Sequence, residues 1–112
     1  LSDLADRGML ESTMVMVIGE FGRTPKINKN AGRDHWGDCF SALMAGGGLT
    51  TGQVIGKSDA LGGYPVERPA HAQDLFATMY HVLGIDPHTI FIDHQNRPIP
   101  VLNHGTPISE LV

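Results

Sequence analysis

The stretch that decides the fold runs from residue 13 to residue 18 and reads Thr13-Met14-Val15-Met16-Val17-Ile18. It is a continuous apolar run, rich in β-branched residues, and Gly19 closes it. A run of this kind is typical of a strand that other elements cover on both faces, as in a parallel sheet. We therefore expect a buried parallel strand at this place.

One helix ends before this strand, and a second helix follows much later in the chain. Apolar residues at positions 1, 4 and 5 share one helical face, and Gly8 comes where a helix commonly stops. Residues 72–83 carry an apolar stripe at helical spacing, with Asp74 in the first turn and Gly84 at the end. The sequence therefore predicts the end of a helix at residues 1–8 and a complete helix at residues 72–83.

Further strands are predicted downstream of the first one. Residues 40–45 read as a second inner strand and residues 53–56 as a short third strand, and the prolines within residues 97–101 suit only an edge strand. This alternation of helix and strand indicates an α/β fold with a mostly parallel sheet. Two or three strands are too few for a complete sheet, and Leu1 already lies in a helix-like pattern. We therefore expect residues 1–112 to form the C-terminal part of one domain whose N-terminal part lies upstream.

Composition excludes several classes of function. Apolar residues make up 41% and charged residues 18%, as in an ordinary globular protein, while fourteen glycines and seven prolines predict many turns and long loops. The net charge is −4 and the eight Lys and Arg are scattered, which predicts no binding to nucleic acid or to an anionic membrane. No apolar run approaches the roughly 20 residues that span a bilayer. Cys39 is the single cysteine, so no internal disulfide forms, and we expect a buried thiol.

The loop from residue 19 to residue 38 holds most of the residues suited to chemistry. Glu20 follows the first strand by two residues, and in α/β sheets working side chains gather beyond the carboxyl ends of the strands. Its carboxylate can ligate a divalent cation or serve as a base, or it can form an ordinary ion pair with Arg23. Arg23 in turn is a candidate contact for an anionic substrate.

His35 is the second candidate in this loop. It lies between Asp34 and Asp38 and is followed by Trp36, a bulky residue that can fix the loop and exclude water. An imidazole beside carboxylates is typical of a metal ligand or a general base, because the carboxylate fixes its tautomer. The alternative is a structural histidine bonded to a loop carbonyl. The glycines at residues 46–48 lack a phosphate-binding pattern and predict a plain turn.

Several segments, in the same order, resemble the C-terminal part of the DUF1501 family. These proteins are similar to members of the alkaline phosphatase and sulfatase superfamily. The resemblance extends from about residue 13 to the end of the chain. It is carried by GEFGRTPKINKNAGRDHW, ALMAGGGLTTGQVIG, DALGGYPVERP, and HVLGID with RPIP.

The resemblance implies an alkaline phosphatase-like α/β/α sandwich with a mostly parallel sheet and a divalent metal ion, either zinc, calcium or manganese. It implies that Glu20 and His35 are metal ligands, that Arg23 contacts the anionic ester and that Asp34 supports the histidine. Related enzymes show Asp-His-Gly after the strand, whereas here Phe21 stands where a histidine ligand is expected. A one-metal or remodelled site is therefore the alternative to two metals. The nucleophile would lie upstream of this chain.

Two main functions follow from the resemblance. The first is a metal-dependent hydrolase that acts on sulfate or phosphate esters, to which this chain contributes the C-terminal portion. The second is a non-catalytic binding or structural domain derived from the same superfamily, which the phenylalanine at position 21 favours. A third alternative is a small α/β module that folds alone. Export from the cytoplasm is expected from the resemblance only.

Overall fold

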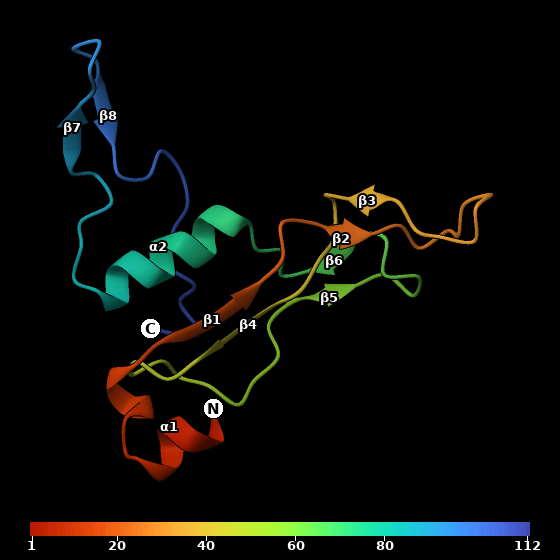
Figure 1. Cartoon of the computed structure of the whole chain (residues 1–112), viewed down its shortest axis with the longest axis horizontal. Coiled ribbons are helices and arrows are strands. Elements are labelled where there is room, and N and C mark those ends of the chain that lie inside the picture. The colour runs from red at the N-terminus through yellow and green to blue at the C-terminus, as the bar shows by residue number, and fades with distance from the viewer.

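A computed structural model describes the whole chain, residues 1–112. Short elements are joined by long loops, and three parts project from a small centre: the N-terminal helix, the β2–β3 loop and the β7/β8 arm (Figure 1). The elements are α1 (Ser2–Asp6), the 3-10 helix η1 (Leu10–Ser12), β1 (Val15–Ile18), β2 (Gly22–Arg23), β3 (His35–Trp36), β4 (Ala42–Ala45), β5 (Lys57–Ser58), β6 (Pro65–Glu67), α2 (Ala72–Val82), β7 (Ile90–Ile92) and β8 (Pro98–Pro100).

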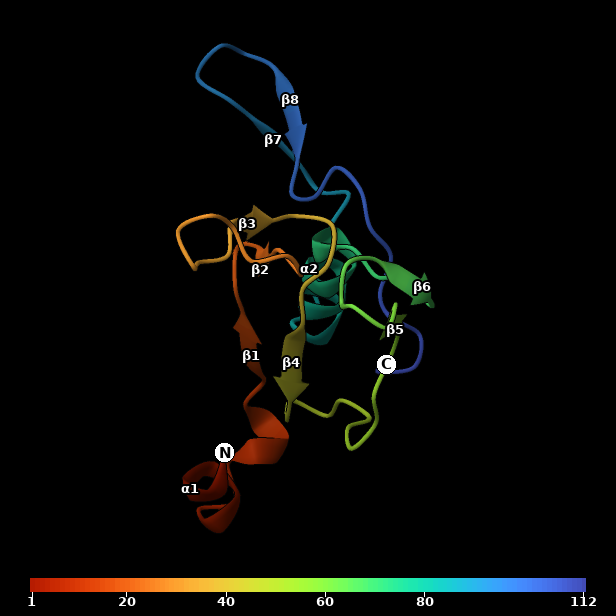
Figure 2. The same cartoon turned by 90° about the vertical axis from the view of Figure 1, so that its right-hand side faces the viewer.

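The strand predicted at residues 13–18 forms, but its surroundings differ from the prediction. β1 pairs with β4 in an antiparallel sheet, and Figure 2 shows the two strands side by side. Val17 lies opposite Leu43 in this register, and these side chains are 60% and 47% exposed. One face of the sheet is therefore open, and the expectation of a strand covered on both faces is wrong.

The predicted fold class is wrong as well, because the chain contains no parallel sheet and no α/β/α sandwich. Its strands form four separate two-stranded antiparallel sheets. Parallel neighbours require a crossover connection, usually a helix, that carries the chain back to the starting edge. Between β1 and β4 the chain instead forms the β2/β3 hairpin, which returns it to the end of β1 that it left. The β5/β6 and β7/β8 sheets close through the short connections at residues 59–64 and 93–97, and β2/β3 through the longer loop at residues 24–34.

The helix predicted at residues 72–83 is confirmed as α2, which begins after His71 and ends at Val82. The Asp74 carboxylate accepts a hydrogen bond from the backbone N–H of His71 at 2.8 Å, which satisfies one free donor at the helix start. The strand predicted at residues 53–56 does not form. The nearest strand, β5, begins one residue later, at Lys57.

The apolar core is small. Leu49, Ile108 and Leu111 form a buried cluster, and side chains from β1, β4 and α2 pack against it only in part. Six of the 112 residues are buried, and the radius of gyration is 17.1 Å, against about 13 Å for a compact domain of this length. Much apolar surface therefore remains open to solvent. No helix has the length and apolar character needed to cross a membrane.

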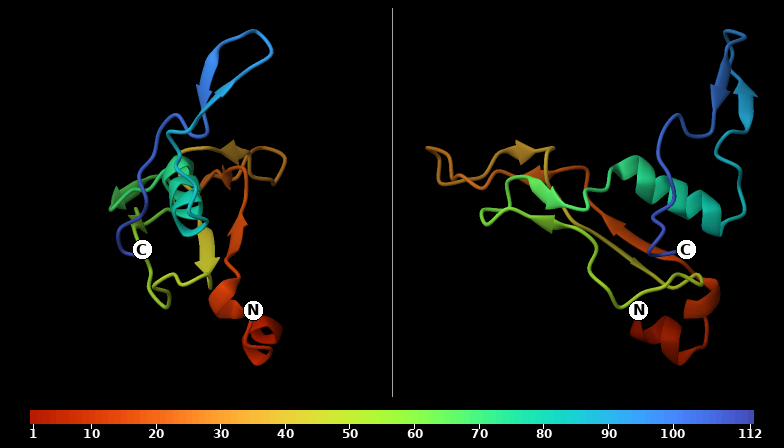
Figure 3. Two further views of the ribbon diagram at one scale, coloured as in Figure 1. Left: turned by 90° about the vertical axis from the view of Figure 1, so that its left-hand side faces the viewer. Right: turned by 180° about the vertical axis from the view of Figure 1, so that it is seen from behind.

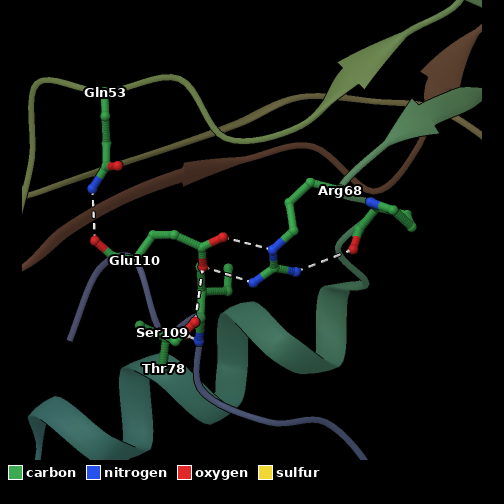
Figure 4. A network of polar contacts seen from close by, with 7 residues as sticks. Gln53, Arg68, Thr78, Ser109 and Glu110 are labelled. Carbon is green, nitrogen blue, oxygen red and sulfur yellow. Dashed lines mark hydrogen bonds and ion pairs between the residues drawn. The ribbon is translucent and has the colours of Figure 1, made fainter.

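Polar contacts hold the C-terminal segment against α2 and the β6 end (Figure 4). The Thr78 hydroxyl, which is fully buried, donates to the Asp74 carbonyl at 2.7 Å and accepts from the Ile108 N–H at 2.9 Å. Arg68 donates to both carboxylate oxygens of Glu110, at 2.6 and 2.7 Å. We call the Arg68–Glu110 pair the C-terminal clasp. It fixes a segment that contributes two of the three core residues.

The β7/β8 arm stands away from the rest of the molecule. The backbone N–H of Val101 donates to the Thr89 carbonyl, and the N–H of Asp93 donates to the Arg97 carbonyl, each at 3.0 Å. The backbone groups of these residues therefore point toward the partner strand. The alternating pattern of an antiparallel pair then turns the nitrogens of residues 98 and 100 toward the free edge. Both are prolines without an N–H, so the prediction of an edge strand at residues 97–101 is confirmed. The partner strand β7 was not predicted.

Candidate functional site

The loop at residues 19–38 folds into a hairpin that extends outward from the ends of β1 and β4, as the rear view in Figure 3 shows. Gly22 pairs with Trp36, and Arg23 pairs with His35. A side chain cannot replace the hydrogen of Gly22, because a Cβ atom there would lie 2.0 Å from the carbonyl oxygen of Cys39. We call residues 22–36 the β2–β3 lobe.

The two predicted metal ligands lie at the base of this lobe. Glu20 and His35 are both exposed, and neither side chain forms a hydrogen bond or an ion pair. Phe21 stacks on the His35 ring with centroids 3.8 Å apart and planes 21° apart. Because Phe21 directly follows Glu20 in the chain, this stack places the imidazole of His35 against the immediate sequence neighbour of Glu20. The structure does not form the alternative ion pair between Glu20 and Arg23.

Trp36 anchors the lobe on the turn that precedes β6. Its indole Nε1 donates to the carbonyl oxygen of Gly63 at 2.6 Å, and its ring meets Tyr64 edge-on at 5.5 Å. Asp59 fixes the same turn, because its carboxylate accepts backbone N–H groups of Leu61, Gly63 and Tyr64. The hydrogen bond from Gly63, ahead of the others, lowers the Asp59 pKa below its usual value. The predicted loop-fixing role of Trp36 therefore has a defined partner.

The two arginines of the lobe are held by backbone carbonyls. Arg23 donates to the carbonyl of Arg33, and Arg33 donates to the carbonyls of Thr24 and Pro25, at 2.6 and 2.5 Å. These bonds cross between the two limbs of the hairpin. A carbonyl carries no formal charge, so both guanidinium groups are oriented while their charge stays uncompensated.

The tip of the lobe is closed by Asn28. Its side-chain oxygen accepts from the backbone of Asn30 and Gly32, and its amide donates to the Asp34 carboxylate at 2.8 Å. Successive side chains of an extended segment point to opposite faces, so the side chains of Asp34 and His35 diverge. The structure therefore does not bring Asp34 and His35 into the contact expected between them.

Basic residues gather in this lobe, although the sequence pattern predicted scattered ones. Four of the eight Lys and Arg lie between residues 23 and 33, all exposed, and none forms an ion pair. The other three arginines each hold a carboxylate. A charge count over an eleven-residue window would have found the cluster. Its members are Arg23, Lys26, Lys29 and Arg33.

The donor set does not fit a complete metal site. No group of three or more His, Cys, Asp and Glu side chains comes together in a way that could hold a metal ion. Zinc sites in proteins use at least three such donors. Glu20 and His35 therefore fall short of the set of side-chain donors that a zinc site uses.

The remaining residues singled out in the sequence have structural roles. Cys39, where a buried thiol is predicted, is free and only half-buried, next to the close approach at Gly22. Gly46, Gly47 and Gly48 all have positive φ angles, and a Cβ on Gly46 would lie 2.3 Å from the Thr13 carbonyl oxygen. Only glycine suits such a turn, and the prediction of a plain turn at residues 46–48 agrees with this geometry.

Comparison with protein families identifies the chain. The model of the family described as "Protein of unknown function (DUF1501)" matches residues 1–112, so the chain belongs to the DUF1501 family. No curated protein and no solved structure matches the chain. The family match confirms the resemblance at the level of DUF1501, without extending it to the superfamily.

Proposed function

We propose that this DUF1501 chain supplies the substrate-anion contacts of a hydrolase acting on sulfate or phosphate esters. The observation that supports this most is Arg23, whose guanidinium is held by a carbonyl, carries an unneutralised charge and lies opposite His35 across β2/β3. The planar fork of an arginine matches the oxygens of sulfate and phosphate groups. Only one of its terminal nitrogens is used by the Arg33 carbonyl, so donors remain for a ligand.

His35 and Glu20 are proposed as the residues next to the reacting bond. Both side chains are exposed, and neither forms a hydrogen bond or an ion pair within the chain, so their polar atoms are open to a ligand. Stacking on Phe21 limits the rotation of the imidazole. The metal-ligand role is part of this proposal for both residues, and any further donors would have to come from outside these 112 residues.

The test uses variants of Arg23 in the intact protein. Arg23→Gln should lower kcat/KM for a sulfate or phosphate monoester about 10- to 100-fold, mainly through KM, because a charge-assisted hydrogen bond is lost. Arg23→Lys keeps the charge but lacks the two-pronged guanidinium, so its kcat/KM should lie between those of the wild type and Arg23→Gln. Arg7→Gln removes the same charge from an exposed ion pair on α1 and is the matched control. Equal effects of Arg23→Gln and Arg7→Gln would refute the assignment.

The ligand roles have a separate test. His35→Ala should lower the metal content of the intact protein in elemental analysis, and His81→Ala on α2 is the control. Unchanged metal stoichiometry in the His35 variant would remove it from the ligand set.

A non-catalytic anion-binding domain is the second candidate. It is favoured by the donor set, which falls short of a metal site, and by the Phe21 ring that covers one face of His35. A panel of sulfate and phosphate esters assayed with added divalent metals distinguishes the two functions. Turnover supports the hydrolase, and Arg23-dependent binding without turnover supports the binding domain.

A further inference from the structure

The β2–β3 lobe carries more positive charge than one sulfate or phosphate group requires. Besides Arg23, the exposed cations Lys26, Lys29 and Arg33 lie on the same hairpin, and Asp34 is the lobe's single acidic residue. Its carboxylate accepts from Asn28 and forms no ion pair. The lobe thus has a net charge of +3 on a chain whose total is −4.

The internal bonds of the lobe orient its two arginines and fix the backbone that carries its two lysines. Arginine-to-carbonyl bonds tie its two limbs together, and the Asn28 side chain closes the tip with three hydrogen bonds. The Thr24 hydroxyl accepts from the Asp34 N–H at 3.0 Å and donates to the Lys26 carbonyl at 2.8 Å. The cations are therefore presented on an ordered hairpin, which lowers the entropy cost of binding.

The number of these cations bears on how many anionic groups the ligand carries. Arg23, Lys26 and Lys29 are three residues apart, and three residues of extended chain span at most about 10 Å. A sulfate or phosphate ester group carries at most about two negative charges, so one bound at Arg23 leaves part of the lobe's +3 charge for a second anionic group. Residues 23–33 contain no aromatic side chain on which a nucleic-acid base could stack, which disfavours nucleic acid in this part of the lobe.

We propose that the β2–β3 lobe binds a short ligand, other than a nucleic acid, that bears at least two sulfate or phosphate groups, one at Arg23 and the next at Lys26 and Lys29. This rests on the proposed function, because it extends the same anion site outward along the hairpin. The negative charge of the rest of the chain opposes long polyanions and favours a short ligand held at the exposed lobe.

The test compares a sulfated hexasaccharide prepared from heparin with inorganic sulfate, by calorimetric titration of the intact protein. The wild type should prefer the hexasaccharide. The double variant Lys26→Gln/Lys29→Gln should bind it roughly 2- to 30-fold more weakly, as expected for two exposed charge contacts, and with a shallower salt dependence. Its affinity for inorganic sulfate should not change. The control Arg7→Gln/Lys57→Gln alters net charge equally outside the lobe and should match the wild type.

Three results would overturn the proposal. The first is that the Lys26→Gln/Lys29→Gln variant, with an unchanged circular dichroism spectrum, still prefers the hexasaccharide to inorganic sulfate as strongly as the wild type does. The second is an equal loss in the control, which would mean that only net charge matters. The third is a single-stranded DNA hexamer that binds as tightly as the hexasaccharide. Sulfate binding independent of Arg23 would instead refute the proposed function, so the two failures are distinguishable.

Discussion

The β2–β3 lobe and the C-terminal clasp use arginine in opposite ways. In the clasp, both oxygens of the Glu110 carboxylate accept from Arg68, and the charges cancel. In the lobe, Arg23 and Arg33 are bound by backbone carbonyls and keep their charge. The first arrangement joins two distant segments, and the second orients cations without neutralising them. Arg68 therefore has a structural role, and for the lobe arginines we propose a role in anion binding.

The largest effect on the free energy of unfolding is expected in the core segment that the C-terminal clasp fixes. Ile108 is 4% exposed and packs with Leu49 and Leu111. Ile108→Ala should lower the free energy of unfolding by about 2 to 5 kcal/mol, through lost apolar contacts and a residual cavity. Urea unfolding of the intact protein measures this change, with exposed Ile27→Ala as the control. Similar losses in both variants would mean that the cluster is not a core.

Thr78 tests the polar link between α2 and the tail. Thr78→Val removes the hydroxyl and leaves the buried N–H of Ile108 without a partner. An unsatisfied buried group costs about 1 to 3 kcal/mol. Thr78→Ser retains the hydroxyl and should recover the hydrogen-bond part of the loss. Equal unfolding free energies for the valine and serine variants would argue against this bond.

The clasp should make stability depend on acid pH. The hydrogen bonds from Arg68 lower the Glu110 pKa from 4.5 to about 2. Between those values the unfolded state binds more protons, so this contribution is complete above pH 4.5 and is lost as the pH falls toward 2. Glu110→Gln should flatten the stability profile in this window. Glu11→Gln, at an exposed residue without an ion pair, should leave it unchanged, and an unaltered profile in the Glu110 variant would contradict the clasp.

The smallest effect on stability is expected in the lobe. Lys26 and Lys29 are exposed and form no ion pair, so replacing both with Gln should change the unfolding free energy by no more than about 0.5 kcal/mol. Thermal denaturation of the double variant checks this. A loss as large as that of the core variant would mean that the lysines support the fold.

Local patterns were read well from the sequence, and long-range pairing was not. The helix at residues 72–83 and the strands near residues 15 and 42 follow from apolar spacing and glycine positions, which act over a few residues. Whether two strands run parallel or antiparallel depends on the connection between them. The β2/β3 hairpin that connects β1 to β4 has no hydrophobic pattern from which it could be predicted. The run at residues 13–18 suggested full burial because composition cannot show that one face lacks a covering layer.

The candidate site was predicted only in part. Glu20, Arg23, Asp34 and His35 were named from their residue types, and the structure pairs Arg23 with His35 across the hairpin. The binding of Asp34 to Asn28 could not be read from the sequence, because it depends on how the tip closes. The outer lysines were missed because charges were judged over the whole chain, where acidic residues outnumber basic ones.

One measurement tests the central claim, that the uncompensated cations of the β2–β3 lobe form an anion site. Amide chemical shifts of the intact protein would be followed by NMR during titration with the sulfated hexasaccharide. The account predicts progressive, salt-sensitive shifts concentrated in residues 23–35, with none at Arg68 or Glu110. Shifts centred on the C-terminal clasp, or an unperturbed lobe at saturating ligand, would contradict it.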